Sequence, residues 1–478
     1  MMRRASVLIA LSLALTGCAT AGPDFKAPAA LDADAPGYAM PGDPVASSVR
    51  LTPESRLAGP WWRAFASPAL DQVMALALAN NPTVAEARAT LERTQSQLSV
   101  VQGEQKVQAD LTASARRTRI NSKLFGFSGF TPPTLSLYSV GSTVSYDLDL
   151  FGGGRRAAEQ ASARVEAARQ EADAAYLSLT ANVARQALMI AATRAQIDAL
   201  EAVVADDRKI FDMVRKAYDQ GGVPLSDAAA AYRRLTDSEA LLPPLQRDLA
   251  TARHQLALLV GRAPGAWAPP EFDVQRFRAP TEIPLALPSN LLRRRPDILA
   301  AEAELHAATA AIGVAEASRY PDIQLSATLT QTSTDAEGLF GYGGSGWNLF
   351  SGLTAPILNG GVLKAQQRGA EAEARAALAR YQQVVVRAFV QVSDGLSNLG
   401  ADTQTHLLAL RSVAANESTL RTAHAAYAQG GATMRQVIEV QQEVNRARRA
   451  AAKAQGQQML DLVTLYAATA ADWRTPRS

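Results

Sequence analysis

The chain has 478 residues, of which 47% are apolar and only 6% aromatic, and alanine is frequent along its whole length. Such a composition suits long packed helices better than a β-sandwich or an α/β enzyme. The net charge of +3 is small and no basic cluster is interleaved with aromatic residues, so nucleic-acid binding is not expected.

The first eighteen residues have the layout of an export signal. Arg3 and Arg4 precede an apolar run, residues 5–15, that is too short to span a bilayer. The segment Leu-Thr-Gly-Cys ending at Cys18 resembles the lipobox of bacterial lipoproteins, where the cysteine carries lipid such as palmitate and becomes the mature N-terminus. Ala19, in place of aspartate, favours an outer-membrane destination. The alternative is an ordinary signal peptide (residues 1–17) with a chance cysteine. No later stretch is apolar enough for a transmembrane helix, so we expect any membrane crossing to use strands.

The rest of the sequence contains an internal repeat. Residues 81–87 (NPTVAEA) are matched by residues 295–301 (RPDILAA), and residues 217–222 (AYDQGG) by residues 426–431 (AYAQGG). The offset stays at about 210 positions, which predicts a tandem duplication. We therefore divide the chain into a lipid-anchored, extended N-terminal segment (18–60), a first repeat (61–270), a linker (271–294), a second repeat (295–471) and a tail (472–478).

Each repeat begins with the same two kinds of element. A helix of about 25 residues is predicted from Pro82 and another from Pro296, because proline is favoured in a first helical turn. Two strands follow in each repeat, at about 105–150 and at about 321–358. Apolar and polar residues alternate there over about ten positions, which is typical of outer-membrane strands. A half-buried strand of a soluble sheet shows the same alternation and remains the alternative.

A very long helix follows the strands of each repeat, at about 154–218 and at about 362–428. Apolar residues recur every seven positions up to Tyr218 and Tyr427, with His406 as the polar exception, and this pattern predicts coiled-coil packing. Tip turns that end the helices are predicted at Gly221, Gly222, Gly430 and Gly431. Returning helices are expected from about 226 and about 433, the first kinked by the prolines at 243 and 244.

Four strands per chain cannot close a membrane barrel, since the smallest barrels have eight, and open strand edges in lipid are very costly. The strands must be pooled between copies. Two chains would give eight strands around a filled lumen, and three would give twelve around a water-filled pore.

At this point the sequence resembles the outer-membrane efflux proteins typified by TolC and OprM, in particular their lipoprotein branch. The resemblance is carried by WWRAF (61–65), RPDILAAEAEL (295–305), AAIGVAEA (310–317) and YPDIQL (320–325). It implies an α+β fold in which a twelve-stranded transmembrane β-barrel joins a long helical periplasmic tunnel. It also implies a homotrimer in outer-membrane lipid that docks onto a periplasmic adaptor protein and an inner-membrane pump, and acts as a passive duct.

The family closes its tunnel with bonds between the helix tips. Counting from the tip glycines carries these positions over to Asp227, Tyr427, Gln436 and Glu439, while the tip arginine position falls on Ala432. The alternative is that Tyr427 only packs on the heptad seam and that Glu439 is a solvated helix residue.

Other patterns are expected to be structural. Residues 151–156 (FGGGRR) lack the spacing of a phosphate loop and predict a strand-to-helix turn, and residues 293–295 (RRR) predict a solvated cluster. His406 has no second ligand at helical spacing, so neither a metal nor a cofactor is expected. No catalytic residues can be assembled, so an enzyme is a distant alternative. The main alternative to a channel is a periplasmic coiled-coil lipoprotein, an adaptor or scaffold without a pore.

Overall fold

The computed structural model describes residues 20–28, 38, 40, 50–53, 60–119, 134–278, 282–285 and 293–469, so Cys18 lies outside the described residues. The chain forms two compact units. Unit 1 takes in residues 1–28, 90–169 and 300–381, and unit 2 takes in residues 29–89, 170–299 and 382–478.

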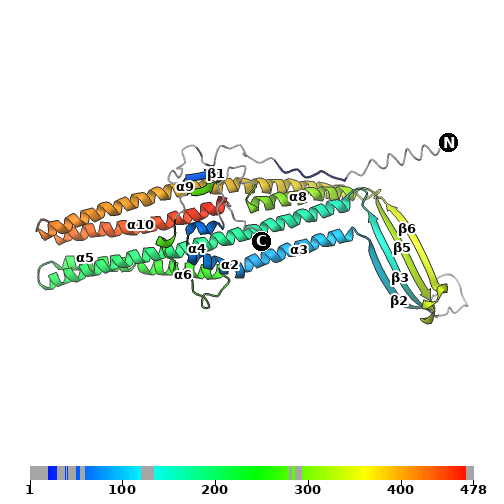
Figure 1. The fold of residues 1–478 in the computed structure, drawn as a ribbon, viewed down its shortest axis with the longest axis horizontal. Coiled ribbons are helices and arrows are strands. Elements are labelled where there is room, and N and C mark those ends of the chain that lie inside the picture. Colours follow the sequence, from blue (N-terminus) through cyan, green and yellow to red (C-terminus); the bar gives the residue numbers. More distant parts are fainter. Residues whose placement is uncertain are drawn as a thin grey trace. The chain divides into compact units, whose positions relative to one another are not determined.

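Unit 1 holds a four-stranded sheet with the order β2-β3-β5-β6, in which all neighbours are antiparallel (Figure 1). The strands are β2 (Gln108–Arg119), β3 (Thr134–Leu148), β5 (Asp322–Ser333) and β6 (Ser345–Thr354). Two single-turn helices, η4 (Glu337–Phe340) and η5 (Tyr342–Gly344), lie between β5 and β6. The four predicted strands are confirmed. The last one ends before the predicted residue 358, since Pro356 cannot donate a ladder hydrogen bond.

The register separates the two faces of the sheet. Ala327 lies opposite Val144 and Leu349, and the next row joins Thr328 to Thr143 and Asn348. Because successive side chains of a strand point to opposite faces, these rows define an apolar face and a polar face. The apolar face includes Leu111, Val140, Val144, Tyr146, Leu325, Leu329, Trp347 and Leu349. The polar face includes Asp110, Thr112, Ser114, Ser139, Thr143, Thr328, Thr330 and Asn348, with Leu135, Leu137 and Phe350 as apolar exceptions.

The helices that precede the strands begin at the predicted prolines. They are α3 (Pro82–Glu104) and α8 (Pro296–Ala317). Among the helices that the structure describes, α8 alone is long and apolar enough to cross a membrane, with a mean hydropathy of 1.3. Length and composition are weak support for a span, because alanine raises the mean and packed helices pass the same test. In unit 1, His306 of α8 contacts Glu159 of the long helix α4 (Gly153–Asp219), with 2.9 Å between Nε2 and Oε1.

Within unit 1, the N-terminal residues 20–28 pack around a buried arginine. Arg156 donates hydrogen bonds to the carbonyl oxygens of Ala21 and Gly22, at 3.0 and 3.1 Å, and to Asp24 Oδ1 at 2.7 Å. A Cβ atom on Gly22 would lie 2.4 Å from the Cα atom of Gly313, so the segment approaches α8 at backbone contact. The FGGGRR turn is therefore a strand-to-helix connection, as predicted, and its second arginine holds the N-terminal segment.

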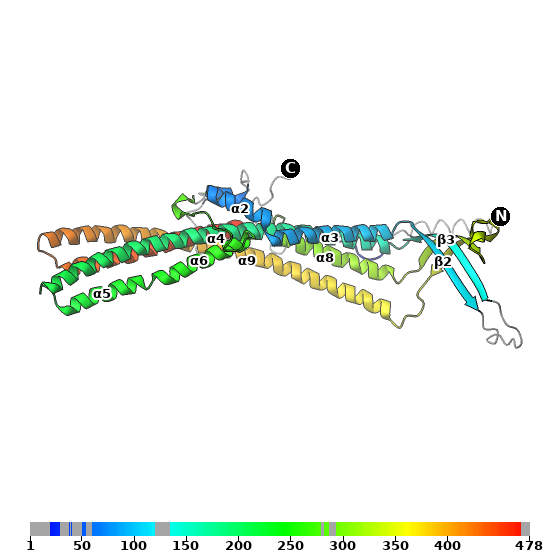
Figure 2. The same cartoon turned by 90° about the horizontal axis from the view of Figure 1, so that it is seen from below.

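Unit 2 contains the helical hairpins. The long helices α4 and α9 (Val362–Ala428) have 67 residues each, and both contribute to the two units. The first returns as α5 (Leu225–Glu239) and α6 (Leu242–Leu259), and the second as α10 (Met434–Thr469). The predicted kink is confirmed as a break between α5 and α6, just before Pro243 (Figure 2). The equal lengths of α4 and α9 agree with a duplicated chain.

Aromatic residues form part of the core of unit 2. Three of them lie in η1 (Trp61–Phe65), which precedes α2 (Pro68–Asn80), and Tyr466 lies in α10. The rings of Trp61 and Tyr466 stack with centroids 6.0 Å apart, and Trp61 Nε1 donates to Thr180 Oγ1 at 3.3 Å. The chain near the predicted linker also folds onto unit 2, through η3 (Val274–Arg276) and a parallel pair of short strands, β1 (Arg50–Pro53) and β4 (Glu282–Leu285).

The heptad seams are buried only along part of their length. Val183, Ile190 and Ile197 are buried as expected, but further along α4 burial moves to Val203 and Ile210. The buried face therefore changes phase by one residue towards the N-terminus between Ile197 and Val203, although the 3.6-residue turn of a straight helix would move it to later positions. In α9 the seam is buried at Val385, Val392 and Leu399, and His406 beyond them bonds Gln458, with 2.8 Å between Nδ1 and Oε1.

One expectation is wrong. The cluster at 293–295 is not solvated throughout, because Arg295 is 8% exposed. Its guanidinium donates twice to the carboxylate of Asp297, at 3.0 and 2.7 Å, and also to Ala468 O at 2.9 Å and Gln391 Oε1 at 2.7 Å. It thereby joins the start of α8 to α9 and α10, a contact between distant segments that no local pattern reveals.

Candidate functional site

Both long helices end in the same capped turn, which accounts for the repeated AYxQGG phrase. Gly221 has φ +73° and Gly430 has φ +74°, a conformation that glycine adopts without steric cost. Gly222 N donates to Ala217 O at 2.8 Å, and Gly221 N donates to Tyr218 O at 2.8 Å. The equivalent bonds of Gly431 and Gly430 measure 2.9 and 3.0 Å. This is a Schellman motif, which satisfies the last helical carbonyl groups and reverses the chain.

An apolar cluster holds the two tips together within unit 2. Ile210 and Val214 of α4 pack against Ala228 and Ala231 of α5, and Ile438 of α10 packs against this group. The tips of the two repeats therefore share one small core, and a side chain that changes the packing of one tip also affects the other.

Two of the predicted gate residues lie on the first turns of α10 and have local partners. Gln436 and Thr433 form a capping box: Thr433 N donates to Gln436 Oε1 at 2.8 Å, and Gln436 N donates to Thr433 Oγ1 at 3.3 Å. Glu439 forms an exposed ion pair with Arg435 on the same helix, at 3.2 Å.

The other two lie beside the tip turns. Tyr427 is in the last turn of α9 and 42% exposed, so its ring is not part of the packed seam within one copy. Asp227 lies in the first turn of α5 and is half-buried, where a carboxylate interacts favourably with the helix dipole. The structure thus gathers these four positions around the two tips of unit 2.

A buried polar group near the tips has no counterpart in the sequence prediction. Asp207 of α4 is buried and accepts a 2.6 Å hydrogen bond from Ser238 Oγ of α5. Burial raises the pKa of Asp207, although Ser238 and the nearby Arg234 act in the opposite direction. Burial also lowers the pKa of Arg234, which the charges of Asp207 and Glu439 partly offset. The available signal was an aspartate within the buried stripe of α4, four residues after Val203.

A second carboxyl group is buried between α9 and α10. Asp461 is 8% exposed and accepts a 3.1 Å hydrogen bond from Gln457 Nε2. Burial, together with a hydrogen bond to Asp402 and the negative charge of that residue, raises the pKa of Asp461 to about 7. The pair therefore retains a proton at acidic pH. Within the described part of the chain, no group of three or more His, Cys, Asp or Glu side chains is placed to hold a metal ion.

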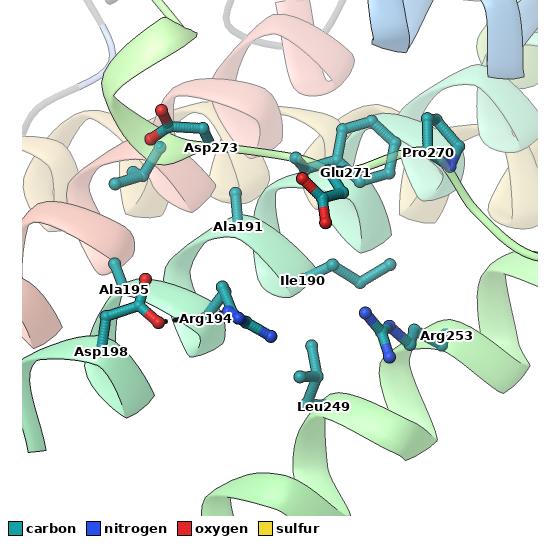
Figure 3. A pocket seen from close by; sticks show the side chains of 12 residues that line it. Ile190, Ala191, Arg194, Ala195, Asp198, Leu249, Arg253, Pro270, Glu271 and Asp273 are labelled. Carbon is teal, nitrogen blue, oxygen red and sulfur yellow. Dashed lines mark hydrogen bonds and ion pairs between the residues drawn. The ribbon is translucent and has the colours of Figure 1, made fainter. Parts of the chain in front are cut away.

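Unit 2 also has a surface cavity of about 260 Å³ between α4, α6 and residues 270–274 (Figure 3). Ile190 and Leu249 supply apolar walls, and Arg194, Arg253 and Glu271 bring charges of both signs. Arg194 is paired with Asp198 on its own helix, at 3.1 Å. The charges are mixed and exposed, so the cavity lacks the convergent donors of an anion site.

The sheet of unit 1 is the other candidate site. Its apolar face is exposed: Leu111, Trp347 and Leu349 are 78%, 76% and 72% accessible. On the polar face, hydroxyl groups bond across strands, as between Ser114 Oγ and Ser139 Oγ at 2.8 Å. An exposed apolar face of this size marks a surface that is covered by lipid or by protein.

Comparisons with known proteins agree with the helix tips and with the two-faced sheet. The family model described as "Outer membrane efflux protein" matches residues 73–262 and 287–471. The antibiotic efflux pump outer membrane protein ArpC of Pseudomonas putida is 30% identical, over 97% of this chain and 95% of its own. The pyoverdine export outer membrane protein OpmQ of Pseudomonas putida is 29% identical, over 98% and 97%.

Solved structures show the same fold. The outer-membrane channel OprN superposes with a TM-score of 0.83 and 26% identity, covering 95% of this chain and all of its own. The MtrE outer membrane channel of Neisseria gonorrhoeae gives a TM-score of 0.83 and 25% identity, over 95% and 99%. The family model, which matches well over half of the residues, and the full-length relatives show that this chain belongs to the outer membrane efflux protein family.

Proposed function

We propose that this chain forms the exit duct of an efflux system in the outer membrane. Three copies join into one barrel and one helical tunnel, each anchored through a lipid on Cys18. A periplasmic adaptor protein and an inner-membrane pump deliver the substrate and supply the energy, and the duct itself is passive.

The observation that carries this proposal is the division of the sheet into an apolar and a polar face. In a membrane barrel the outward residues contact lipid and the inward residues contact water, so strands alternate in this way. A soluble sheet of four strands would cover its apolar face with helices or a second sheet. Trp347 and Leu349 on that face are largely exposed, which favours lipid contact.

The edges of the sheet favour assembly from several copies. β2 and β6 are the first and last strands of the sheet, and each offers one unpaired edge among the described strands. With four antiparallel strands, β6 of one copy runs antiparallel to β2 of the next, so the ring closes without a parallel pair. Three copies give twelve strands, enough for a water-filled lumen, whereas two give eight strands and a filled interior.

The tips are the proposed gate. Asp227, Tyr427, Gln436 and Glu439 lie around the tip turns, where neighbouring copies in a ring would bring their helices together. Gln436 and Glu439 have partners on their own helix, so we assign them to shaping the tip and Tyr427 to contact with the next copy. Rings of carboxylates at a constriction favour cations.

The substrates of relatives are small organic compounds. Their names refer to pyoverdine export, antibiotic efflux and solvent efflux. We propose that this duct also carries small organic compounds, and that the pump, rather than the duct, selects among them.

The decisive experiment is the native mass of the detergent-extracted protein, followed by conductance in planar bilayers. Three chains that conduct support the duct. A monomer that is released without detergent after Cys18→Ser, and that gives no conductance, would instead support a periplasmic adaptor or scaffold. The mass of the N-terminal peptide tests lipidation directly, because an acylated Cys18 adds the mass of its fatty chains.

The gate has a separate test. Asp227→Ala combined with Glu439→Ala should reduce the preference of the pore for cations, measured as the reversal potential in a salt gradient. Glu443→Ala, one turn further along α10, is the matched control, because it removes a carboxylate paired with Arg446 outside the tip. Unchanged selectivity in the double variant would remove these carboxylates from the gate.

A further inference from the structure

We propose that Arg117 and Arg119 bind the phosphate groups of anionic lipids in the outer leaflet of the membrane. The inference rests on the proposed function, in which the apolar face of the sheet lies against lipid. It concerns a site at the end of β2 that the duct itself does not require.

The register places both arginines on the apolar face. Ala113 lies opposite Val140, Arg117 opposite Ser136 and Arg119 opposite Thr134. Residues two apart on a strand share a face, so Arg117 and Arg119 point to the same side as Val140. Arg116 lies between them in sequence and belongs to the polar face.

Their level along the strands fits the headgroup layer. On β3 the outward residues run from Leu148 to Tyr138, which lies opposite Ala115, and Ser142 is the one small polar side chain between them. These eleven positions match the nine to eleven residues of a membrane-spanning strand. Arg117 and Arg119 follow Ala115 by two and four residues, or about 7 and 14 Å along the strand. Tyrosine marks the interface in such barrels, so the two guanidinium groups lie beyond the hydrocarbon.

The end of the strand identifies the leaflet. β2 begins just after α3, and β3 is followed by α4, so the helices attach at the opposite end of the sheet from Arg119. With the helices in the periplasm, Arg119 faces the outside of the cell.

The charge pattern of this face is one-sided. Among the strand residues that the structure describes, Arg117 and Arg119 are the only charged ones on the apolar face, and both are exposed. No ion pair of either arginine occurs within the described residues. Asp335 lies at the same end of the sheet but accepts the 2.6 Å hydrogen bond of Gly338 N. A guanidinium binds phosphate through two parallel hydrogen bonds, and this geometry favours phosphorylated lipids over neutral ones.

Native mass spectrometry of the detergent-extracted trimer, titrated with bisphosphorylated lipid A, tests the site. One basic side chain at an anionic surface changes binding about fivefold, so R117Q/R119Q should bind the lipid about thirtyfold more weakly. R116Q removes one positive charge on the polar face of the same strand and should bind like the natural chain, whereas R117Q or R119Q alone, with the same charge loss, should each bind about fivefold more weakly. Dephosphorylated lipid should bind the natural chain as weakly as lipid A binds the double variant.

Other results would overturn the assignment. Equal binding by the natural chain and R117Q/R119Q, or an equal loss in R116Q, would remove these arginines from lipid binding. If inorganic phosphate bound and lipid A bound no better than its dephosphorylated form, the site would take a free anion instead. If the double variant does not assemble, R117Q and R119Q alone provide the same comparison. Trimer mass and conductance of the same samples report on the duct, so a failed lipid site and a failed duct are distinguishable.

Discussion

Replacing Asp461 by asparagine is expected to stabilise the protein above neutral pH and to leave it unchanged near pH 4. Asp461 is buried beside Asp402, and its pKa rises from 3.8 in an open chain to about 7 in the folded protein. A carboxyl group with a raised folded pKa keeps its proton on folding. Stability is therefore complete below about pH 4 and is lost as the pH rises towards 7.

The size of the effect follows from the shift. About three pH units at 1.36 kcal/mol each give an upper limit of roughly 4 kcal/mol lost at pH 8. Asparagine carries no charge and repeats the contacts of the protonated acid, since its oxygen can accept from Gln457 and its amide can donate to Asp402. D461N should consequently remain as stable at pH 8 as at pH 4.

The assay is the midpoint of thermal unfolding of the purified protein, followed by circular dichroism between pH 4 and pH 8. The natural chain and D461N should agree near pH 4 and separate steadily up to pH 7. D402N is the control, because it removes the neighbouring negative charge that helps to raise the pKa of Asp461, so its loss of stability should be smaller and should end at a lower pH than in the natural chain. Parallel curves for the natural chain and D461N would refute the shared-proton reasoning.

Three further substitutions test other parts of the structure. Gly221→Ala places a Cβ at φ +73° and should cost about 1 kcal/mol in thermal unfolding, whereas Gly103→Ala, in an open helical position, should stabilise by a similar amount; equal midpoints would contradict the tip geometry. Arg295→Lys keeps the charge but loses the forked contact with Asp297, and about 3 kcal/mol of stability should go with it; an unchanged midpoint would argue against a buried role. Trp347→Arg should lower the amount of protein in outer membranes, because a charge facing the middle of the bilayer costs about 2–4 kcal/mol. Asn348→Arg places its charge towards the lumen and should leave the amount of protein in outer membranes unchanged. Equal amounts of the two variants would contradict the register.

Local patterns in the sequence were sufficient to predict the helices from Pro82 and Pro296, the long and returning helices, the four strands of the sheet and the tips. The Gly-Gly pairs after Tyr218 and Tyr427 encode the helix ends, because the left-handed turn requires glycine at its first position. The alternation around Val144 encodes which side chains share a face, since a strand has a strict period of two. These features depend on residues close together in the chain.

Contacts between distant segments could not be predicted from local patterns in the sequence. Arg295 was expected in solvent, and only the packing of α8 against α9 and α10 buries it. Asp207 is buried because the face of α4 turned towards α5 departs from the predicted heptad positions beyond Ile197. Gln436 was assigned to the gate by its distance from the tip, and its capping partner Thr433 lies three residues before it, a pairing that the capping-box pattern could have indicated.

The two open edges of the sheet have a consequence for inheritance. In a head-to-tail ring each copy contributes one β2 edge and one β6 edge, and the two are not interchangeable. A mutant copy whose β6 edge can no longer pair with the next copy still presents a normal β2 edge. It therefore joins the ring and prevents its closure. When normal and mutant alleles are expressed equally and their products mix at random, about one trimeric ring in eight contains only normal copies. Mutations at one edge should therefore behave as dominant, whereas mutations that prevent the chain from folding at all should be recessive.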